Sequence, residues 1–533
     1  MGTRSWWGWG DEDRHLEGQA LDGLAALVAD RLGSEVPRPA DVPDPSGLPP
    51  ASNLTVPNTL SSLVSTEPVD RVRHSRGNAY RDVVRALRGE LPAYVEAVAR
   101  PRTEDDVARL LDWAADADIA CVPFGGGTSV VGGVTTPNDG RPVVALDLEH
   151  LAGVDEVDEV SLAAHVRGGT YGPAINDALR DRGLTLRFFP QSWEFSTMGG
   201  WVATRAGGHF ATGPTHIGDL VEAVDAVTPA GRWSSRRLPA SGAGPSPDRL
   251  LLGSEGAFGV ITGAWVRVQR RPTFRASATV ALPDLHVGLD ALRAITQAGL
   301  RPANARLLDA SEAQLNGAGD GSSAVLALGY EGSDHPLGPT LARTIELCRD
   351  HGGTVTDGPH QREGDRTGEA SGGAGEWRSA FLNAPYLRDA LVRLGVVVET
   401  FETATTWDRA HDLVDDVARA ARDAATDACG AAVVTTRVTH AYPDGCAPYF
   451  TVLAPGRRGD EVAQWDAVKT AASDAILAAG GTITHHHAVG RDHAPWHARQ
   501  VPDLHLRSLR AVKAELDPAA VCNPGVLGLH GER

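Results

Sequence analysis

The densest group of titratable side chains in this sequence is the run His485-His486-His487. Imidazole titrates near neutral pH and can donate or accept a proton, so the run favours acid–base chemistry and anion binding. On a strand, His486 would face opposite to His485 and His487. Zinc is the alternative, with His493 and His497 close by as further ligands. We favour the acid–base interpretation and predict no metal.

A second chemical feature is the loop Pro123-Phe124-Gly125-Gly126-Gly127-Thr128-Ser129, which follows a short apolar strand. Adjacent glycines allow positive φ angles and a close approach to a ligand, and their N–H groups can converge on an anion. The loop matches neither GxGxxG nor GxxxxGK[ST]. By itself, it is as readily a flexible turn as a phosphate cradle.

Two later glycine-rich stretches, residues 196–208 and 253–262, change this interpretation. Three such stretches in this order resemble the vanillyl-alcohol-oxidase family of flavoproteins. The resemblance implies FAD, with the first loop around the pyrophosphate and the later stretches along the flavin ring and ribityl chain. The implied cofactor-binding residues are Pro123, Gly125, Gly126, Gly127, Thr128, Ser129, Ser196, Thr197, Gly199, Gly200, Thr204, Glu255, Gly259, Val260 and Ile261.

Some members of that family attach FAD covalently through a histidine in or near the first loop. No His or Cys lies between Pro123 and Gly133, although Cys121 stands just before the loop. We therefore predict that FAD is bound non-covalently.

Further stretches, spread from end to end, resemble the alkyldihydroxyacetonephosphate synthase (alkylglycerone-phosphate synthase) subfamily. They are Trp7-Gly8-Trp9-Gly10, Glu194-Phe195-Ser196-Thr197, Ala305-Arg306-Leu307-Leu308-Asp309, Tyr386-Leu387-Arg388-Asp389, Glu402-Thr403, Arg437-Val438-Thr439, Tyr449-Phe450 and the triple histidine. The resemblance implies an enzyme of ether lipid biosynthesis. It would exchange the acyl group of an acyl-dihydroxyacetone phosphate for a fatty alcohol through a flavin N5 adduct.

The same resemblance implies roles for individual side chains. Tyr449 matches a tyrosine that transfers a proton at the reacting carbon, and His486 matches the essential base. A tyrosine acts as a base only if its pKa is lowered, for example by a cation. The residues implied around the phosphate and the leaving carboxylate are Arg388, His485 and His487, with Arg306 near the substrate.

A different reaction would use the same residues. A dehydrogenase or oxidase of a D-2-hydroxy acid, or of a similar small anion, also needs groups that bind a carboxylate and abstract a proton. The sequence leaves this alternative open. A flavin-binding protein without catalysis is disfavoured, because several candidate acid–base residues accompany the glycine loops.

The elements that must position these residues predict an α+β fold. We expect a PCMH-type FAD-binding domain of two α+β lobes at 93–272 and a cap domain at 273–495, with an antiparallel sheet flanked by helices. Residues 1–92 are expected to form one helical segment and a proline-rich arm, and 496–533 to return to the FAD-binding domain. The acidic stretch 353–376 lacks periodicity and predicts an exposed loop or a mobile lid.

Composition narrows the partners. The formal charge is −18 and no Lys/Arg cluster is present, which disfavours nucleic acid. No apolar run is long enough for a membrane-spanning helix. The five cysteines are scattered without CxxC spacing, which indicates reduced thiols in the cytoplasm, and the preference for arginine over lysine indicates a bacterial source. We expect a small phosphorylated or carboxylated substrate, and leave open a homodimer and peripheral membrane contact.

Overall fold

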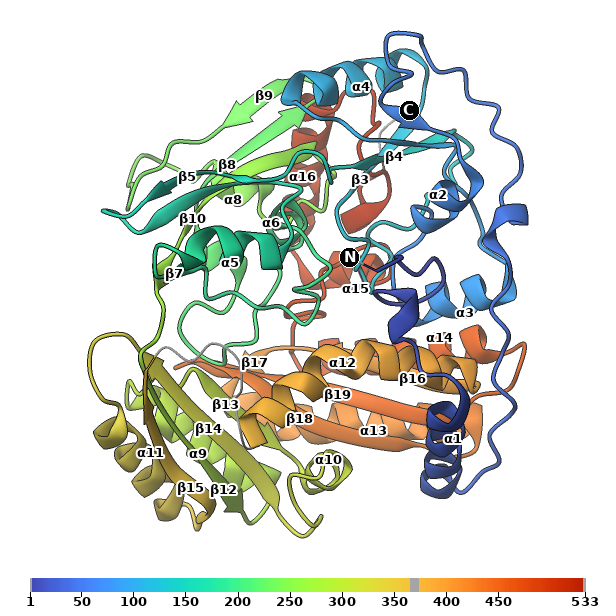
Figure 1. The fold of residues 1–533 in the computed structure, drawn as a ribbon. Coiled ribbons are helices and arrows are strands. Elements are labelled where there is room, and N and C mark those ends of the chain that lie inside the picture. Colours follow the sequence, from blue (N-terminus) through green and yellow to red (C-terminus); the bar gives the residue numbers. More distant parts are fainter. Residues whose placement is uncertain (1, 365–372, 531–533) are drawn as a thin grey trace.

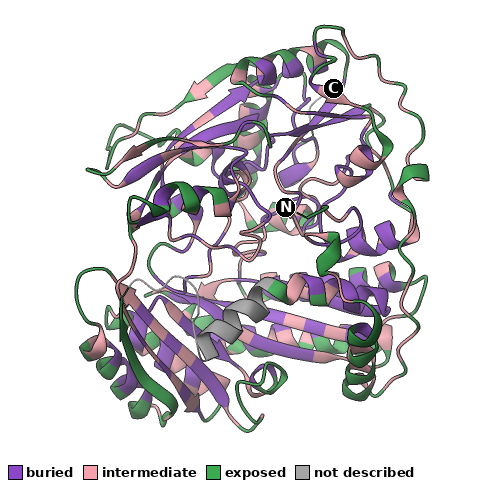
Figure 2. Ribbon diagram, in the orientation of Figure 1, coloured by how far each residue is buried: buried purple, intermediate pink, exposed green. Residues whose placement is uncertain are grey.

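The computed structural model describes residues 2–364 and 373–530 of the chain. In Figure 1 two small sheets lie in the upper half, and a large sheet lies in the lower half. We call the part with the two small sheets the first domain and the part with the large sheet the second domain. Buried residues run along the strands of both, as Figure 2 shows.

The first lobe of the first domain is a four-stranded sheet of order β1-β2-β4-β3. Its strands are β1 (Val64–Ser65), β2 (Ala97–Ala99), β4 (Val143–Asp147) and β3 (Ala120–Phe124). The last three are parallel and almost wholly buried, as expected for a parallel sheet covered on both faces. Thr103 is the N-cap of helix α4 (Glu104–Asp116), and its side chain accepts a hydrogen bond from the backbone N–H of Asp106.

The second lobe is an antiparallel sheet of order β5-β6-β10-β8-β9. Its strands are β5 (Val154–Asp158), β6 (Ala163–Arg167), β10 (Val260–Arg267), β8 (Val221–Thr228) and β9 (Gly231–Ser234). The lobe also holds α5 (Gly172–Arg180), α6 (Met198–Thr204), α7 (Ile217–Leu220), α8 (Asp248–Leu251) and the short pair β7 (Leu184–Thr185) and β11 (Gln269–Arg270). Helix α6 packs on β10 and β6, which brings two of the glycine stretches together.

The second domain is built on an eight-stranded antiparallel sheet of order β15-β12-β14-β13-β18-β19-β16, with β17 paired to β19. The strands are β12 (Phe274–Leu282), β13 (Asn304–Leu308), β14 (Ala324–Gly332), β15 (Thr354–Glu363), β16 (Val396–Glu402), β17 (Thr405–Thr406), β18 (Val433–Ala441) and β19 (Gly445–Pro455). The helices are α9 (Leu285–Gln297), α10 (Ala310–Leu315), α11 (Gly338–Asp350), α12 (Gly373–Arg393), α13 (Ala410–Cys429) and α14 (Glu461–Ala478). Helices α9, α11 and α13 pack against the strands and bury their apolar faces there.

One expectation for the second domain is wrong. The stretch 353–376 was expected to be a loop, yet residues 354–363 form β15, which pairs with β12 at the edge of the sheet. Nearly all β15 residues are exposed, so the strand has no apolar alternation that a sequence reading could detect. Helix α12 begins at Gly373, and residues 365–372 of the expected lid lie outside the described residues.

The N-terminal segment contains more structure than the expected helix and arm. It holds α1 (Gly18–Leu32), α2 (Pro68–Arg73) and α3 (Tyr80–Arg88), and Trp6, Trp7 and Trp9 are buried. The backbone N–H of Trp9 donates to the Asp389 carboxylate on α12, and the Arg76 guanidinium donates to the carbonyl of Trp6. Because β1 of the same segment pairs with β2, the segment contacts both domains, and Figure 1 shows its start between them.

The C-terminal segment lies against the first domain. In Figure 1 helix α16 (Asp503–Leu516) appears in red within the upper half, and helix α15 (Ala494–Gln500) lies near mid-height. After α16, Val521 and Asn523 pair with Cys121 of β3, through Cys121 N–H to Val521 O at 2.7 Å and Asn523 N–H to Cys121 O at 2.8 Å. The strand that precedes the glycine loop is thus held on its outer edge by the end of the chain.

Candidate active site

The glycine loop presents unused backbone donors. No acceptor in the described part of the chain takes the N–H groups of the five residues 125–129. The loop is held from behind by Asn78, whose side-chain amide donates to Gly127 O at 2.8 Å and whose backbone N–H donates to Ser129 O at 2.6 Å. Consecutive free N–H groups beside a close turn suit an anionic group such as a diphosphate.

The glycines are required because the loop lies directly on the second glycine stretch. A Cβ atom on Gly126 would stand 1.6 Å from the carbonyl oxygen of Phe195, and one on Gly125 would stand 2.3 Å from Thr197 Oγ1. Gly127 has φ +67°, which favours glycine. Ser196 Oγ accepts from the Trp201 indole N–H at 2.6 Å, so this hydroxyl already has a partner within the protein.

The third stretch meets the second through α6 and β10. A Cβ atom on Gly199 would lie 2.9 Å from Gly168 O and 3.1 Å from Ile261 O. Val260 and Ile261 are buried, and the Thr204 hydroxyl donates to Gly200 O at 2.9 Å. The structure therefore brings together all three stretches that the sequence singled out. Gly259, at φ +149°, directly precedes β10, and a Cβ atom on it would stand 2.6 Å from Val227 O.

Glu255 joins the third stretch to the histidine segment. Its carboxylate accepts hydrogen bonds from Val489 N–H at 2.9 Å and Gly490 N–H at 2.7 Å. Burial raises the pKa of Glu255 to about 7, although these two donors and Arg491 act in the opposite direction. Its position indicates that Glu255 locks the histidine segment onto the first domain.

The triple histidine lies in a loop, so the strand considered for it, and the alternation of side chains with it, is wrong. The loop wraps around one carboxylate on β16. Glu402 Oε1 accepts from the backbone N–H groups of His485 at 3.0 Å, His486 at 2.6 Å and His487 at 2.7 Å. Burial by itself would raise the pKa of Glu402, but His487, His486 and the N–H donors hold it well below its usual value.

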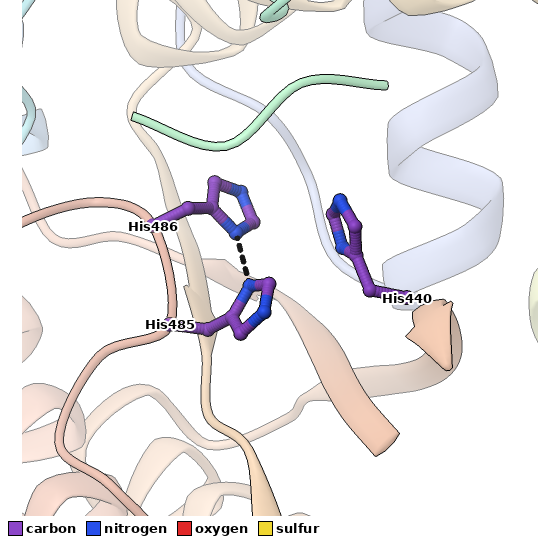
Figure 3. A group of neighbouring side chains, drawn as sticks. All are labelled: His440, His485 and His486. Carbon is purple, nitrogen blue, oxygen red and sulfur yellow. Dashed lines mark hydrogen bonds between the residues drawn. The ribbon is translucent and has the colours of Figure 1, made fainter. Parts of the chain in front are cut away.

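The imidazoles form a chain of close contacts. In Figure 3, His485 and His486 lean toward one another, and their Nδ1 atoms are 3.0 Å apart, while His440 stands beside them on β18. Burial lowers the pKa of His486 to about 3 and shifts those of His485 and His440 in the same direction. The three rings are therefore neutral at neutral pH, and a neutral imidazole can accept a proton.

Two groups of side chains here have the spacing of metal ligands. The ligand atoms of His440, His485 and His486 lie within 4.8 Å of one another, as do those of Glu402, His486 and His487. Both ring nitrogens of His440 are already hydrogen-bonded, Nε2 to Gly208 O and Nδ1 to Thr439 Oγ1, each at 2.9 Å. The hydrogen bonds account for this arrangement without an ion, and the absence of a metal stays a prediction.

Tyr449 on β19 faces this group. Its ring centroid is 6.3 Å from that of His486 and 5.9 Å from that of His487, and the Arg437 guanidinium lies 4.0 Å above the ring. Burial raises the pKa of Tyr449, and the opposing effect of Arg437 does not reverse this. The lowered pKa that a tyrosine base requires is therefore not found here, and this tyrosine carries its proton and is suited to donate it.

Arg388 is close to the loop, but its donors are occupied. Its Nε and Nη2 donate to Asp389 Oδ1 at 2.9 and 2.6 Å, and Nη1 donates to the carbonyl of Asn78. A cavity of about 30 Å³ lies between Arg388, Asn78, Lys469 and His487. Because Asn78 holds the glycine loop, Arg388 is better placed to position that loop than to bind a phosphate itself.

Arg306 on β13 provides positive charge near His440. It is only 2% exposed, and its Nη2 lies 3.0 Å from His209 Nδ1. Burial and the neighbouring Arg437 lower its pKa. Arg437 is paired with Glu312 at 2.6 Å. One buried and one half-buried guanidinium group near the imidazoles favour an anionic substrate.

Several site residues were missed as functional candidates in the sequence. They are Asn78, Glu402, Arg437 and His440. Glu402 could have been found from the sequence, because it and Glu399 are the acidic residues of the largely apolar strand Val396–Glu402. Asn78 and His440 had none, since only the fold brings them to the site.

Known proteins share this architecture. Residues 95–235 match the FAD binding domain model, and residues 271–527 match the model of FAD linked oxidases, C-terminal domain. The alkyldihydroxyacetonephosphate synthase of Dictyostelium discoideum is 25% identical, over 97% of this chain and 92% of its own. The enzyme of that name from Caenorhabditis elegans is 29% identical, over 86% of this chain and 80% of its own.

Solved structures show the same fold. An alkyldihydroxyacetonephosphate synthase superposes with a TM-score of 0.81 at 22% identity, covering 98% of both chains. A p-cresol methylhydroxylase with bound substrate has a TM-score of 0.68 at 14% identity, covering 88% of this chain and 94% of its own.

These findings confirm the predicted fold class, FAD as cofactor and catalysis by a flavin. The unused N–H groups of residues 125–129 fit the FAD diphosphate. The chain is an FAD-dependent enzyme of the PCMH-type fold, similar over its length to alkyldihydroxyacetonephosphate synthases.

Proposed function

We propose that this enzyme exchanges the acyl group of an acyl-dihydroxyacetone phosphate for a fatty alcohol, the reaction implied by its resemblance to alkyldihydroxyacetonephosphate synthases. The observation that carries the proposal is the pairing of a neutral base with a protonated acid. His486 has a lowered pKa, and Tyr449, 6.3 Å away between ring centroids, has a raised one. At neutral pH the two side chains are therefore in the protonation states that a base and an acid require.

Bound FAD would supply a ring able to hold the reacting carbon while one oxygen substituent is replaced by another. The N–H groups of residues 125–129 would hold its diphosphate, with Asn78 and Arg388 behind the loop. No hydrogen bond among the described residues engages His486 Nε2, so this atom is available to take the substrate proton. Tyr449 would donate to the departing carboxylate.

The substrate phosphate is assigned to the positive charge of the buried Arg306 and the half-buried Arg437. Arg306 and Arg437 lie on neighbouring strands, β13 and β18, which pair at Leu308 and Arg437. A guanidinium binds phosphate through two parallel hydrogen bonds, and the binding is stronger where water is excluded. His487 flanks the base, and we propose that it faces the phosphate or the leaving carboxylate. His485, which the sequence also assigned there, has both ring nitrogens engaged by Tyr442 and His486. A phosphorylated ketone therefore suits the site.

The surroundings support two further proposals. Cys121 is 1% exposed and burial raises its pKa to about 12, which supports non-covalent FAD despite its position next to the loop. The five cysteines are free, which supports a cytoplasmic protein. No helix among the described residues has the length and apolar character needed to cross a membrane. The homodimer and peripheral membrane contact stay predictions.

One experiment tests the proposal. The yellow holoenzyme is incubated with palmitoyl-dihydroxyacetone phosphate and radiolabelled hexadecanol, and the label is followed into an ether-linked product. The same preparation is mixed under anaerobic conditions with D-lactate or D-2-hydroxyglutarate while the visible flavin absorbance is recorded. The proposal expects labelled ether without bleaching. Bleaching by a hydroxy acid without labelled ether would favour the dehydrogenase instead.

A further inference from the structure

A large pocket lies apart from the glycine loops. It has a volume of about 700 Å³ and is lined in part by exposed residues, Asp408, Arg409 and Asp444 among them. Its other walls include Thr405, Tyr442 and Gln500. None of the residues implied in cofactor binding lines it, so the flavin site does not explain it.

Tyr442 connects this pocket to the histidines. Its hydroxyl is 2.7 Å from His485 Nε2, and the other ring nitrogen of His485 is 3.0 Å from His486 Nδ1. Thr215 Oγ1 lies 3.0 Å from the same hydroxyl and fixes its position. An unbroken chain of hydrogen bonds therefore leads from a residue that lines the pocket to the proposed base.

We propose that Tyr442 and His485 form a proton relay between water in this pocket and His486. The inference rests on the proposed role of His486 as the base. It adds Tyr442 as a positioning and relay residue and gives the pocket a role as the solvent end of the relay.

The steps balance when each side chain of the relay gives up one proton as it receives another. His486 Nε2 takes a proton from the substrate carbon, and the proton on His486 Nδ1 passes to His485 Nδ1. The proton on His485 Nε2 passes to the Tyr442 oxygen, whose own proton goes to a water molecule. One proton leaves the substrate and one reaches water, and both imidazoles change tautomer. Delivery of a proton in the opposite direction restores the tautomers.

The surroundings favour a relay over direct access of water to the base. Burial raises the pKa of Tyr442 to about 12, so the hydroxyl stays protonated and hands on protons without ionising. His216 also approaches, with Nε2 2.9 Å from the carbonyl of His485 and Nδ1 3.1 Å from Thr215 Oγ1. These contacts hold the backbone of His485 and the Thr215 hydroxyl and leave both ring nitrogens of His485 to the relay.

The test is Tyr442→Phe, which removes the hydroxyl and keeps the ring. Holoenzyme is incubated with palmitoyl-dihydroxyacetone phosphate in D₂O without alcohol, and deuterium in the recovered substrate is measured by mass spectrometry. We expect exchange to slow roughly 10- to 100-fold with KM for the substrate and FAD content unchanged. The matched control is Tyr330→Phe on β14 of the large sheet. It removes a buried hydroxyl that is hydrogen-bonded to Thr344 of α11. It should exchange at the normal rate.

Exchange at the normal rate in a folded, yellow Tyr442→Phe protein would overturn the relay. A proton inventory on the unaltered enzyme, in mixtures of H₂O and D₂O, covers the case in which the variant does not fold. A curved plot is expected for several protons in flight, and a straight line for one proton contradicts the relay. If the unaltered enzyme shows no exchange at all, the assignment of His486 as base fails instead.

Discussion

The backbone nitrogen of His486 lies 2.6 Å from Glu402 Oε1, and the same oxygen accepts the N–H groups of both neighbouring histidines. The Thr484 hydroxyl donates to it as well, at 2.9 Å. One buried carboxylate therefore shapes the loop that carries the proposed base. The charge that fixes the loop also lies beside His486 Nδ1, at 3.8 Å, so it affects both geometry and protonation.

Replacing Glu402 by glutamine tests this relationship. The amide can keep an acceptor oxygen toward the loop but loses the charge, and its NH2 group takes the place of Oε2, which lies 3.2 Å from His487 Nδ1. We expect the free energy of unfolding to fall by about 3 kcal/mol and turnover to fall at least about 100-fold. Urea denaturation and the labelled-alcohol assay measure the two effects. Glu346→Gln, at an exposed position on α11, is the control and should change neither. A normally active Glu402→Gln enzyme would show that the charge is dispensable.

Tyr449→Phe separates the acid from the base. Because the pKa of Tyr449 is raised, its hydroxyl is protonated at neutral pH, and its loss should remove a proton donor but no charge. We expect kcat to fall about 100- to 10,000-fold, with FAD content and thermal stability nearly unchanged. Steady-state kinetics and flavin absorbance check this. Unchanged kcat would mean that the leaving group departs without help from Tyr449.

The glycine loop makes a prediction about cofactor binding. In Gly126→Ala, the new methyl group would meet Phe195 O at 1.6 Å, so the loop must move away from the second stretch. We expect purified protein with little or no flavin absorbance, while Gly23→Ala on α1, where a Cβ atom meets nothing within 4 Å, stays yellow. Full flavin stoichiometry in Gly126→Ala would refute the assignment of this loop to the diphosphate.

The sequence predicts the cofactor side of the site better than the catalytic side. Each glycine stretch is local, so Gly125 to Gly127 are recognisable without the fold. The direction of a pKa shift is not local. The lowering of the Tyr449 pKa by Arg437 is outweighed by burial, and burial depends on how β19 packs between β16 and β18.

The large sheet shows a similar division. Strands with alternating burial, such as Phe274–Leu282, carry their period in the sequence. The exposed strand Thr354–Glu363 is held only by its pairing with that neighbour, so its polar residues predicted a loop. The buried tryptophans of the N-terminal segment were likewise visible as residues, but their partners lie far along the chain, at Arg76 and Asp389.

Acid should destabilise the protein partly through His493. This residue is 1% exposed, and burial, together with Lys469, lowers its pKa to about 3 from an ordinary 6.5. Its folded form binds a proton less readily than the unfolded form, so its contribution to stability is complete above pH 6.5 and declines as the pH falls toward about 3. The expected slope is about 1.4 kcal/mol per pH unit for this one group.

The variant His493→Asn keeps a side-chain donor near Ala488 O, which His493 Nδ1 contacts at 2.9 Å. Between pH 6 and 4 the slope of its unfolding free energy against pH should be smaller by up to about 1.4 kcal/mol per pH unit. Urea titrations at several pH values measure it, with the exposed His335→Asn as control. Equal slopes in His493→Asn and the unaltered protein would mean that His493 is protonated in the folded state despite its burial.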